Sequence, residues 1–260
     1  MYAAGHSFFT YMSDNADSLS SCCRLRNEIQ DNGFSYTLGA GGVSTGSKSV
    51  LTVNLNRCIQ YAVRNGRPYT EFLEDVVDRM HKFQLAYNEN LKHLQSKGML
   101  PLFDAGYITM GRQYLTIGVN GLVEAAEFLG IEISDNPQYA AFVQDVLGIV
   151  EKYNKQYRTA DVLFNCEMIP AENVGVKHAK WDREDGYIVP RDCYNSYFYA
   201  VEDPSLNVLD KFRLHGRRYV EHLTGGSALH MNLDEHLSKA QYRQLLRVAA
   251  REGTNYFTFN

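Results

Sequence analysis

The sequence is short of several features that mark common classes of protein. Its 260 residues hold 26 lysines and arginines against 30 aspartates and glutamates, so the basic excess typical of nucleic-acid-binding domains is missing. No apolar run is long enough to span a bilayer, and residues 1–10 lack the basic start of a secretory signal peptide. These absences predict a cytoplasmic protein with neither a membrane nor a nucleic-acid partner.

Cysteine is also scarce, and its spacing is irregular. The five cysteines include no C-x-x-C pair, and their odd number does not favour a disulfide framework or the commonest zinc site. They are Cys22, Cys23, Cys58, Cys166 and Cys193. We expect no metal site in this chain, and we expect each cysteine to be a free thiol that is either inert and buried or reactive.

What the sequence does contain is an alternation of helical and strand-like segments. The clearest helix spans 70–97, with Thr70 as its cap and Gly98 as its stop. Its apolar residues, spaced by three and four, predict one buried stripe: Phe72, Val76, Met80, Phe83, Tyr87, Leu91 and Leu94. Further helices are expected at 122–129, 136–157 and 238–252, and strands at 50–55, 162–166 and 228–233. This order predicts an α/β fold with parallel strands joined by helical crossovers.

Two stretches carry groups suited to chemistry. In S-S-C-C-R-L, at 20–25, the charge of Arg24 favours the thiolate of Cys23, which supports a nucleophile, a redox thiol or no function at all. In N-C-E-M-I-P-A-E-N, at 165–173, Glu167 follows a strand, where it could be a general acid or base or a solvated carboxylate. The loop Pro170–Gly175 leads into a predicted helix, whose first N–H groups could bind a phosphate.

A third stretch, 187–199, is dense in aromatic, amide and charged side chains. We expect Arg191 and Asp192 to pair, and we interpret most of the other positions as a buried polar network that organises the core. Cys166, at the end of a predicted strand, is an alternative candidate for a reactive thiol.

Six motifs follow one another in an order that is specific to one enzyme family. They are S-S-C-C-R-L, G-S-K-S-V-L-T-V-N-L-N-R, L-T-I-G-V-N-G-L-V-E-A, E-M-I-P-A-E-N, V-P-R-D-C-Y-N-S-Y-F-Y and T-G-G-S-A-L-H. Together, from about Phe8 to Asn260, they resemble the catalytic part of anaerobic (class III) ribonucleoside-triphosphate reductases. The resemblance implies part of a ten-stranded α/β barrel through which a finger loop carries a cysteine.

The resemblance also implies a reaction, the reduction of ribonucleoside triphosphates for DNA precursor synthesis. In the family a glycyl radical oxidises the cysteine of a Cys-Arg pair, here Cys23 and Arg24, to a thiyl radical that abstracts the 3′ hydrogen of the ribose. Glu167 resembles the active-site glutamate of relatives that use a thioredoxin-like reductant. Ser47 stands where formate-using relatives have asparagine, and Ser21 where they have methionine, which favours a thiol reductant.

The resemblance extends to binding residues and partners. The implied substrate-binding residues are Arg24, Pro170, Ala171, Glu172, Asn173 and Gly175. The implied partners are a ribonucleoside triphosphate, a radical-SAM activating enzyme and a second copy in a homodimer. The effector-binding domain, the structural zinc site and the glycyl-radical loop of the family are absent from residues 1–260. We therefore expect a single catalytic barrel fragment that binds no cofactor and is inactive alone.

Two other readings of the sequence stay open. One is a fragment of a different glycyl-radical enzyme, such as a formate-lyase-like acyltransferase, although the phosphate loop at Pro170–Gly175 disfavours it. The other is a non-catalytic nucleotide-binding paralogue. A reading frame downstream that encodes the zinc and glycyl segments would favour a catalytic enzyme.

Overall fold

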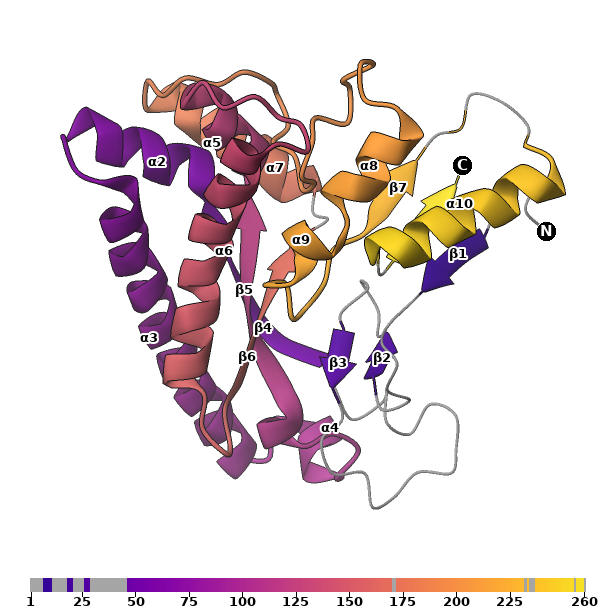
Figure 1. Ribbon diagram of the computed structural model, residues 1–260. Coiled ribbons are helices and arrows are strands. Elements are labelled where there is room, and N and C mark those ends of the chain that lie inside the picture. The colour runs from indigo at the N-terminus through magenta and orange to yellow at the C-terminus, as the bar shows by residue number, and fades with distance from the viewer. Residues whose placement is uncertain are drawn as a thin grey trace.

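A computed structural model places most of the chain after residue 45 in α/β layers around two small sheets. It describes residues 7–10, 18–20, 26–28, 46–169, 172–231, 233, 237–254 and 256–259, the first three segments and Glu172 by backbone alone. Figure 1 shows helices packed along one side of a central sheet, with a second sheet and its helix beside them. The predicted α/β class is confirmed.

The central sheet is parallel throughout. It consists of β4 (Gly46–Asn54), β5 (Gln113–Asn120) and β6 (Leu163–Met168), in the order β4-β5-β6. Helices α2 (Leu55–Arg64), α3 (Tyr69–Ser96), α4 (Pro101–Asp104) and the short 3₁₀ turn η3 (Met110–Arg112) lie between β4 and β5 in the chain. Helices α5 (Leu122–Phe128) and α6 (Pro137–Tyr157) lie between β5 and β6. Each crossover returns the chain to the start of the next strand, as parallel pairing requires.

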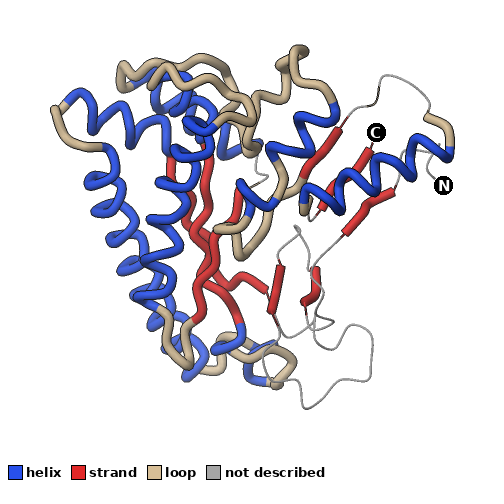
Figure 2. The backbone as a smooth tube through the Cα atoms, viewed as in Figure 1, coloured by secondary structure: helices blue, strands red, loops and turns tan. Residues whose placement is uncertain are grey.

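The long helices α3 and α6 pack side by side on one face of this sheet (Figure 2). The start of α6 is as predicted, because Pro137 occupies its first turn and the Asn136 side chain accepts the N–H of Tyr139 at 2.8 Å. The predicted end of α5 is also confirmed, since Gly130 adopts a left-handed φ of 70°.

The prediction for α3 was right in extent and wrong in two details. The helix begins at Tyr69 and ends before Gly98, but its cap is Pro68 and no side chain caps it, so Thr70 has no such role. The predicted buried stripe is displaced, since Phe83 is 70% exposed and Tyr87 45% exposed. The buried positions are Leu73, Val77, His81, Gln84, Asn88 and Leu91, of which only Leu91 was predicted.

Buried hydrogen bonds explain why this face of α3 is partly polar. His81 bonds through Nε2 to Oδ1 of Asn154 on α6 at 2.9 Å, and Gln84 donates to the carbonyl of Thr116 on β5 at 3.0 Å. A polar group that finds such partners can be buried with little penalty. Apolar spacing alone therefore selected the wrong face of the helix.

The second sheet joins distant parts of the chain. It has the order β1-β8-β7, with β1 (Ser7–Thr10) antiparallel to β8 (Tyr256–Phe259) and β8 parallel to β7 (Leu229–Met231). Between β7 and β8 runs α10 (Lys239–Glu252), which starts at Ser238 and stops at Gly253 as predicted. The remaining elements are the paired strands β2 (Ser18–Ser20) and β3 (Arg26–Glu28) and helices α7 (Glu172–Glu184), α8 (Val208–Leu214) and α9 (Arg217–Val220).

Two glycines bring the chain that leads into β7 against the free edge of β6. The N–H of Gly225 donates to the carbonyl of Cys166 at 2.7 Å, and Gly226 forms a parallel bridge with Glu167. A Cβ on Gly225 would lie 2.8 Å from that carbonyl oxygen, so a side chain here would force the two segments apart. The T-G-G motif thus continues the β structure from the central sheet toward the second one. Among the described helices, none combines the length and apolarity needed to cross a membrane.

Candidate functional site

The two faces of the central sheet differ in chemistry because successive side chains point to opposite sides of a strand. On β5, Ile117 and Val119 belong to the buried hydrophobic core, whereas Thr116 lies between core positions and faces the other way. On β6, Cys166 and Met168 are core residues. The alternate residues of β6 therefore face away from α3 and α6.

These alternate residues form a polar group, which we call the polar face: Ser47, Thr116, Asn165 and Glu167. Thr116 is the direct partner of Asn165 in the register of β5 and β6. The hydroxyls of Ser47 and Thr116 lie 2.7 Å apart, and Ser47 also donates to the carbonyl of Ser49 at 2.9 Å across an irregularity in β4. Two of the predicted catalytic residues, Ser47 and Glu167, therefore lie on the same face.

Glu167 is enclosed on this face. It is 4% exposed, and its neighbours in the sheet are Gly118 on β5 and Gly226 on the other side. The interpretation of Glu167 as a solvated loop carboxylate is wrong, since the residue lies within β6 and is buried. A carboxylate enclosed by protein in this way is suited to proton transfer, because bulk water does not compete for its hydrogen bonds.

Cys166 points to the opposite side of β6, into the core. It is 0% exposed, and its burial, followed by the charges of Glu167 and Glu151, raises the pKa of its thiol well above the usual range. A thiol in that state stays protonated and is a poor nucleophile. The structure therefore argues against Cys166 as the reactive thiol.

The predicted phosphate loop is described only from its helical part onward. Pro170 and Ala171 lie outside the described residues, and so does the side chain of Glu172. Asn173 is exposed on the first turn of α7. Gly175 is buried, and a Cβ on it would lie 2.6 Å from the carbonyl oxygen of Tyr194, so α7 packs directly on that backbone. Gly175 is thus required for packing, and its role toward a substrate stays a prediction.

One turn further along α7, His178 is fixed in a single protonation form. Asn120, the last residue of β5, donates through Nδ2 to the carbonyls of Tyr194 and Asn195, at 3.3 and 3.2 Å. Its Oδ1 therefore faces Nδ1 of His178 at 2.9 Å, and Nδ1 must be the donor. Burial lowers the pKa of His178, which keeps the ring neutral near pH 7.

A buried carboxylate, Asp182, fixes the other end of α7. Arg57 and the hydroxyl of Tyr194 donate to it at 2.6 and 2.8 Å, and Asn54 and Asn56 at 2.9 and 3.0 Å. Asn54 is the last residue of β4, so this cluster ties α7 to the carboxyl end of the central sheet. Gly175, His178 and Asp182 lie on one face of the helix, at spacings of three and four. Contacts along this face therefore hold α7 in a fixed position, from Gly175 in its first turn to Asp182 near its end.

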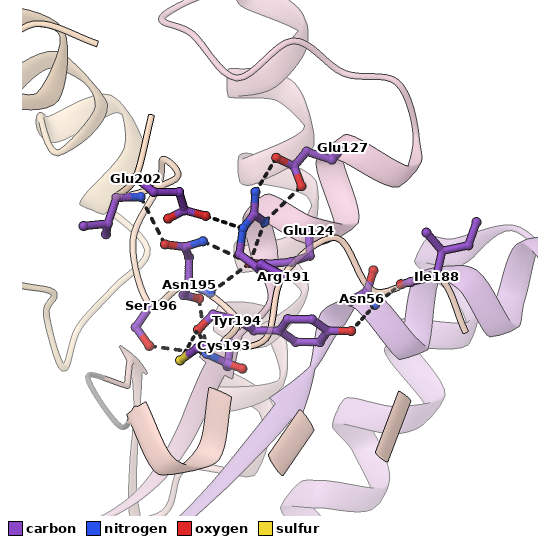
Figure 3. A network of polar contacts seen from close by, with 12 residues as sticks. Asn56, Glu124, Glu127, Ile188, Arg191, Cys193, Tyr194, Asn195, Ser196 and Glu202 are labelled. Carbon is purple, nitrogen blue, oxygen red and sulfur yellow. Dashed lines mark hydrogen bonds and ion pairs between the residues drawn. The ribbon is translucent and has the colours of Figure 1, made fainter. Parts of the chain in front are cut away.

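A second polar network supports the chain segment on which α7 packs (Figure 3). Arg191 pairs with Glu124 at 2.8 Å, Glu127 at 2.7 Å and Glu202 at 2.6 Å. Glu124 also accepts two hydrogen bonds from Asn195, from the backbone N–H at 2.9 Å and the side chain at 3.0 Å. The interpretation of this stretch as a buried polar network is confirmed.

The predicted pair of Arg191 and Asp192 was wrong. Asp192 points outward with a side chain 93% exposed, and it pairs with Arg183 at 2.6 Å. Arg191 points the other way and finds its partners in Glu124 and Glu127 of α5 and in Glu202.

The remaining predicted site residues, Cys23 and Arg24, lie outside the described residues, as does Ser21. In the chain they fall between β2 and β3. Among the described residues, no three His, Cys, Asp or Glu side chains come together as a metal site would need. The prediction missed Thr116 and Asn165, although the alternation of small polar and apolar residues in L-T-I-G-V-N is a signal that could have found Thr116.

A parallel sheet with a polar, buried face and a helix start fixed at its carboxyl end is the arrangement of an α/β enzyme. Three solved structures that resemble this chain are all named as anaerobic ribonucleotide reductases. One, titled an anaerobic ribonucleotide reductase, has 30% sequence identity and a TM-score of 0.77 over 84% of this chain. The enzyme from Thermotoga maritima in complex with dATP and CTP has 29% identity and a TM-score of 0.76 over 83%. The same enzyme with glycerol in the active site has 28% identity and a TM-score of 0.77 over 90%.

The family follows from the sequence match. Residues 2–260 match the family model of the anaerobic ribonucleoside-triphosphate reductases. The chain belongs to that family, and its fold is part of the α/β barrel of those enzymes. No curated protein sequence matches it. The chain spans 36 to 38% of the length of the three reductase structures above.

Proposed function

We propose that this chain forms the part of a catalytic barrel in which ribonucleoside triphosphates are reduced to deoxyribonucleoside triphosphates. The observation that carries the proposal is the position of Glu167, buried on the polar face of the sheet. The family match supports the reaction class, and the nucleotide complexes of the Thermotoga maritima enzyme support the kind of ligand. The other glycyl-radical enzymes are a weaker alternative, because the match covers residues 2–260 of this chain.

In this proposal the sulfur of Cys23, as a thiyl radical, accepts the 3′ hydrogen atom of the ribose. The 2′ hydroxyl then takes up a proton and leaves as water, and the thiol reductant supplies the two electrons of the reduction. A glycyl radical, which the family resemblance implies outside this chain, would supply the oxidising equivalent. Glu167 takes the proton of the 3′ hydroxyl as the sugar radical forms, because a carboxylate held beside that hydroxyl can act as its general base. Ser47 and Thr116 are positioned to order the same side of the sugar, since their hydroxyls already bond to each other.

The triphosphate end of the substrate is proposed to bind at the start of α7. Backbone N–H groups in the first turn of a helix have no partner within the helix and favour an anion. The contacts of Gly175, His178 and Asp182 hold this turn in place before a substrate arrives. The proposed substrate-binding residues at this end are Arg24, Pro170, Ala171, Glu172, Asn173 and Gly175, of which Pro170 has no backbone N–H to donate.

The partners belong to the proposal as well. We propose a cytoplasmic enzyme that acts as a homodimer, that is activated by a radical-SAM enzyme, and that draws electrons from a thioredoxin-like reductant. Ser47 and Ser21, in place of the asparagine and methionine of formate-using relatives, support the thiol reductant. A structural zinc site and the glycyl-radical loop would lie in parts of the enzyme outside this chain.

The test replaces Cys23 in the complete reductase. We expect Cys23→Ala to abolish deoxynucleotide formation while the glycyl radical still forms at the wild-type level, as measured by electron paramagnetic resonance. Cys22→Ala is the matched control, because it removes the neighbouring thiol and should keep most of the turnover. Normal product formation by Cys23→Ala would refute the assignment. A wild-type protein that binds triphosphates but makes no product would favour a non-catalytic paralogue.

A further inference from the structure

One buried side chain on the polar face has hydrogen-bonding groups that no described residue uses. Asn165 is 0% exposed, and neither its Nδ2 nor its Oδ1 has a hydrogen-bond partner in the part of the chain that the structure describes. Among the described side chains, His215 is the other one whose polar atoms are all buried and without such a partner. The rings of Tyr197, Phe198 and Tyr199 surround His215, whereas Asn165 lies beside polar groups.

The surroundings of Asn165 bring it close to the proposed catalytic carboxylate. A Cβ on Gly225 would lie 3.1 Å from Nδ2 of Asn165 and 3.2 Å from Cβ of Glu167, so both side chains border the same point of that backbone. Thr116, the partner of Asn165 in the sheet, already bonds to Ser47. On the polar face, the hydroxyls of Ser47 and Thr116 are thus paired with each other. The carboxamide of Asn165, next to Glu167, can still form hydrogen bonds.

The chemistry of the Asn165 carboxamide limits which groups can form hydrogen bonds with it. Nδ2 donates and Oδ1 accepts, so the complementary group is one that can both accept and donate, which a hydroxyl oxygen does. A buried amide without partners is unfavourable in the free protein, because it has lost its hydrogen bonds to water. A bound molecule that supplies the missing hydrogen bonds would explain why such a group is buried.

We propose that Asn165 is a binding residue that holds a hydroxyl oxygen beside Glu167. The proposal rests on the proposed function only for the source of that oxygen, which is either a hydroxyl of the substrate sugar or a bound water. In both cases Asn165 places an oxygen within reach of the carboxylate that is proposed to move the proton. Asn165 would then act on the reaction through the position of that oxygen.

The test compares two buried asparagines on opposite sides of the central sheet in the complete reductase. If the oxygen belongs to the sugar, the free Asn165→Leu enzyme should keep or raise its Tm, because an unsatisfied amide is replaced by an apolar group of similar size. If the oxygen is a bound water, the Tm should fall, because the water loses its partner. The affinity of Asn165→Leu for CTP should fall about ten-fold, the effect of losing one or two hydrogen bonds. Asn88→Leu is the control, since Asn88 is a buried residue of α3 with an unpartnered Oδ1. Its affinity for CTP should not change.

A nucleotide without sugar hydroxyls distinguishes the two sources. If the oxygen belongs to the sugar, wild type and Asn165→Leu should bind 2′,3′-dideoxy-CTP equally. If it is a water, the ten-fold difference should persist with that nucleotide. An affinity of Asn165→Leu for CTP equal to that of wild type would overturn the proposal. Asn165→Ala serves the same comparison if the leucine does not fit.

Failure of the proposed function would look different. A wild-type enzyme that binds neither nucleotide would refute nucleotide binding and, with it, the sugar as the source. A crystal structure would then decide whether a water is bound to Asn165. An ordered oxygen within hydrogen-bond distance of the Asn165 carboxamide supports the proposal, and its absence at high resolution contradicts it.

Discussion

The two faces of the β4–β5–β6 sheet are built from alternate residues of the same strands, yet they have different tasks. On one face Ile117, Val119 and Cys166 enter the apolar core beneath α3 and α6. On the other, Thr116, Asn165 and Glu167 form a buried polar surface. The apolar face stabilises the sheet, so the polar face can keep groups that do not help folding. Neighbouring substitutions on one strand should therefore separate stability from chemistry.

The largest change in stability is expected at the ion pair between Arg191 and the buried Glu124. Arg191→Met would leave the fully buried side chain of Glu124 without its cation and lower the free energy of unfolding by about 3–5 kcal/mol. Denaturant unfolding measures this. Arg183→Met is the control, since its partner Asp192 is 93% exposed, and it should change the free energy by less than about 1 kcal/mol. Equal effects of the two substitutions would contradict the account.

The same pair predicts a pH dependence. Burial raises the pKa of Glu124 above its ordinary value of 4.5, against the lowering by Asn195 and Arg191. The folded state therefore holds this proton more tightly than the unfolded state does, and stability from this group is fully present below pH 4.5 and is lost as pH rises through the raised pKa. Arg191→Met should raise this pKa further, so the loss should extend to higher pH, as unfolding measured between pH 4 and pH 8 (roughly the range of such shifts) would show. The same pH range of loss in the variant and the wild type would contradict it.

The next comparison uses adjacent residues of β5. Ile117→Ala should lower the free energy of unfolding by about 2–5 kcal/mol, because Ile117 is 0% exposed in the core. Thr116→Val keeps the shape and removes one hydroxyl, so it should lower that free energy by only about 1 kcal/mol. The order should be the opposite for turnover. Per folded enzyme, Thr116→Val should lose more activity than Ile117→Ala. A larger loss of stability in Thr116→Val would show that the polar face also holds the fold together.

The smallest effect is expected on the outer face of α3. Phe83 is 70% exposed, so Phe83→Gln should change the free energy of unfolding by less than about 0.5 kcal/mol. The apolar pattern of the sequence predicts the opposite, a buried aromatic ring whose loss destabilises by about 3–5 kcal/mol. Thermal unfolding of this one variant decides between the two.

Local chemistry could be predicted from the sequence, and long-range partners could not. The cap at Asn136 and the stop at Gly253 act within a few residues, so α6 and α10 were predicted with nearly correct bounds. The face of α3 depends on the partners of His81 and Gln84, which lie on other elements. Arg191 pairs with residues more than 60 positions away on α5.

The candidate site was also predicted only in part. Glu167 was predicted from its position after a strand and from the family resemblance, and Ser47 from the resemblance alone. Their shared face came from the register of β4, β5 and β6. Asn165 could not be found from the sequence, because only the packed structure shows that its carboxamide is enclosed and has no partner among the described residues.

The central claim, that catalysis takes place on the polar face, is tested most directly by the turnover of two variants at neighbouring positions of β6. Glu167→Gln removes the carboxylate from the polar face, and Cys166→Ala removes the thiol from the apolar face. We predict that Glu167→Gln lowers the rate of deoxynucleotide formation by at least about 100-fold with little change in stability. Cys166→Ala should lose stability and keep its rate per folded enzyme. An active Glu167→Gln, or a folded but inactive Cys166→Ala, would contradict the account.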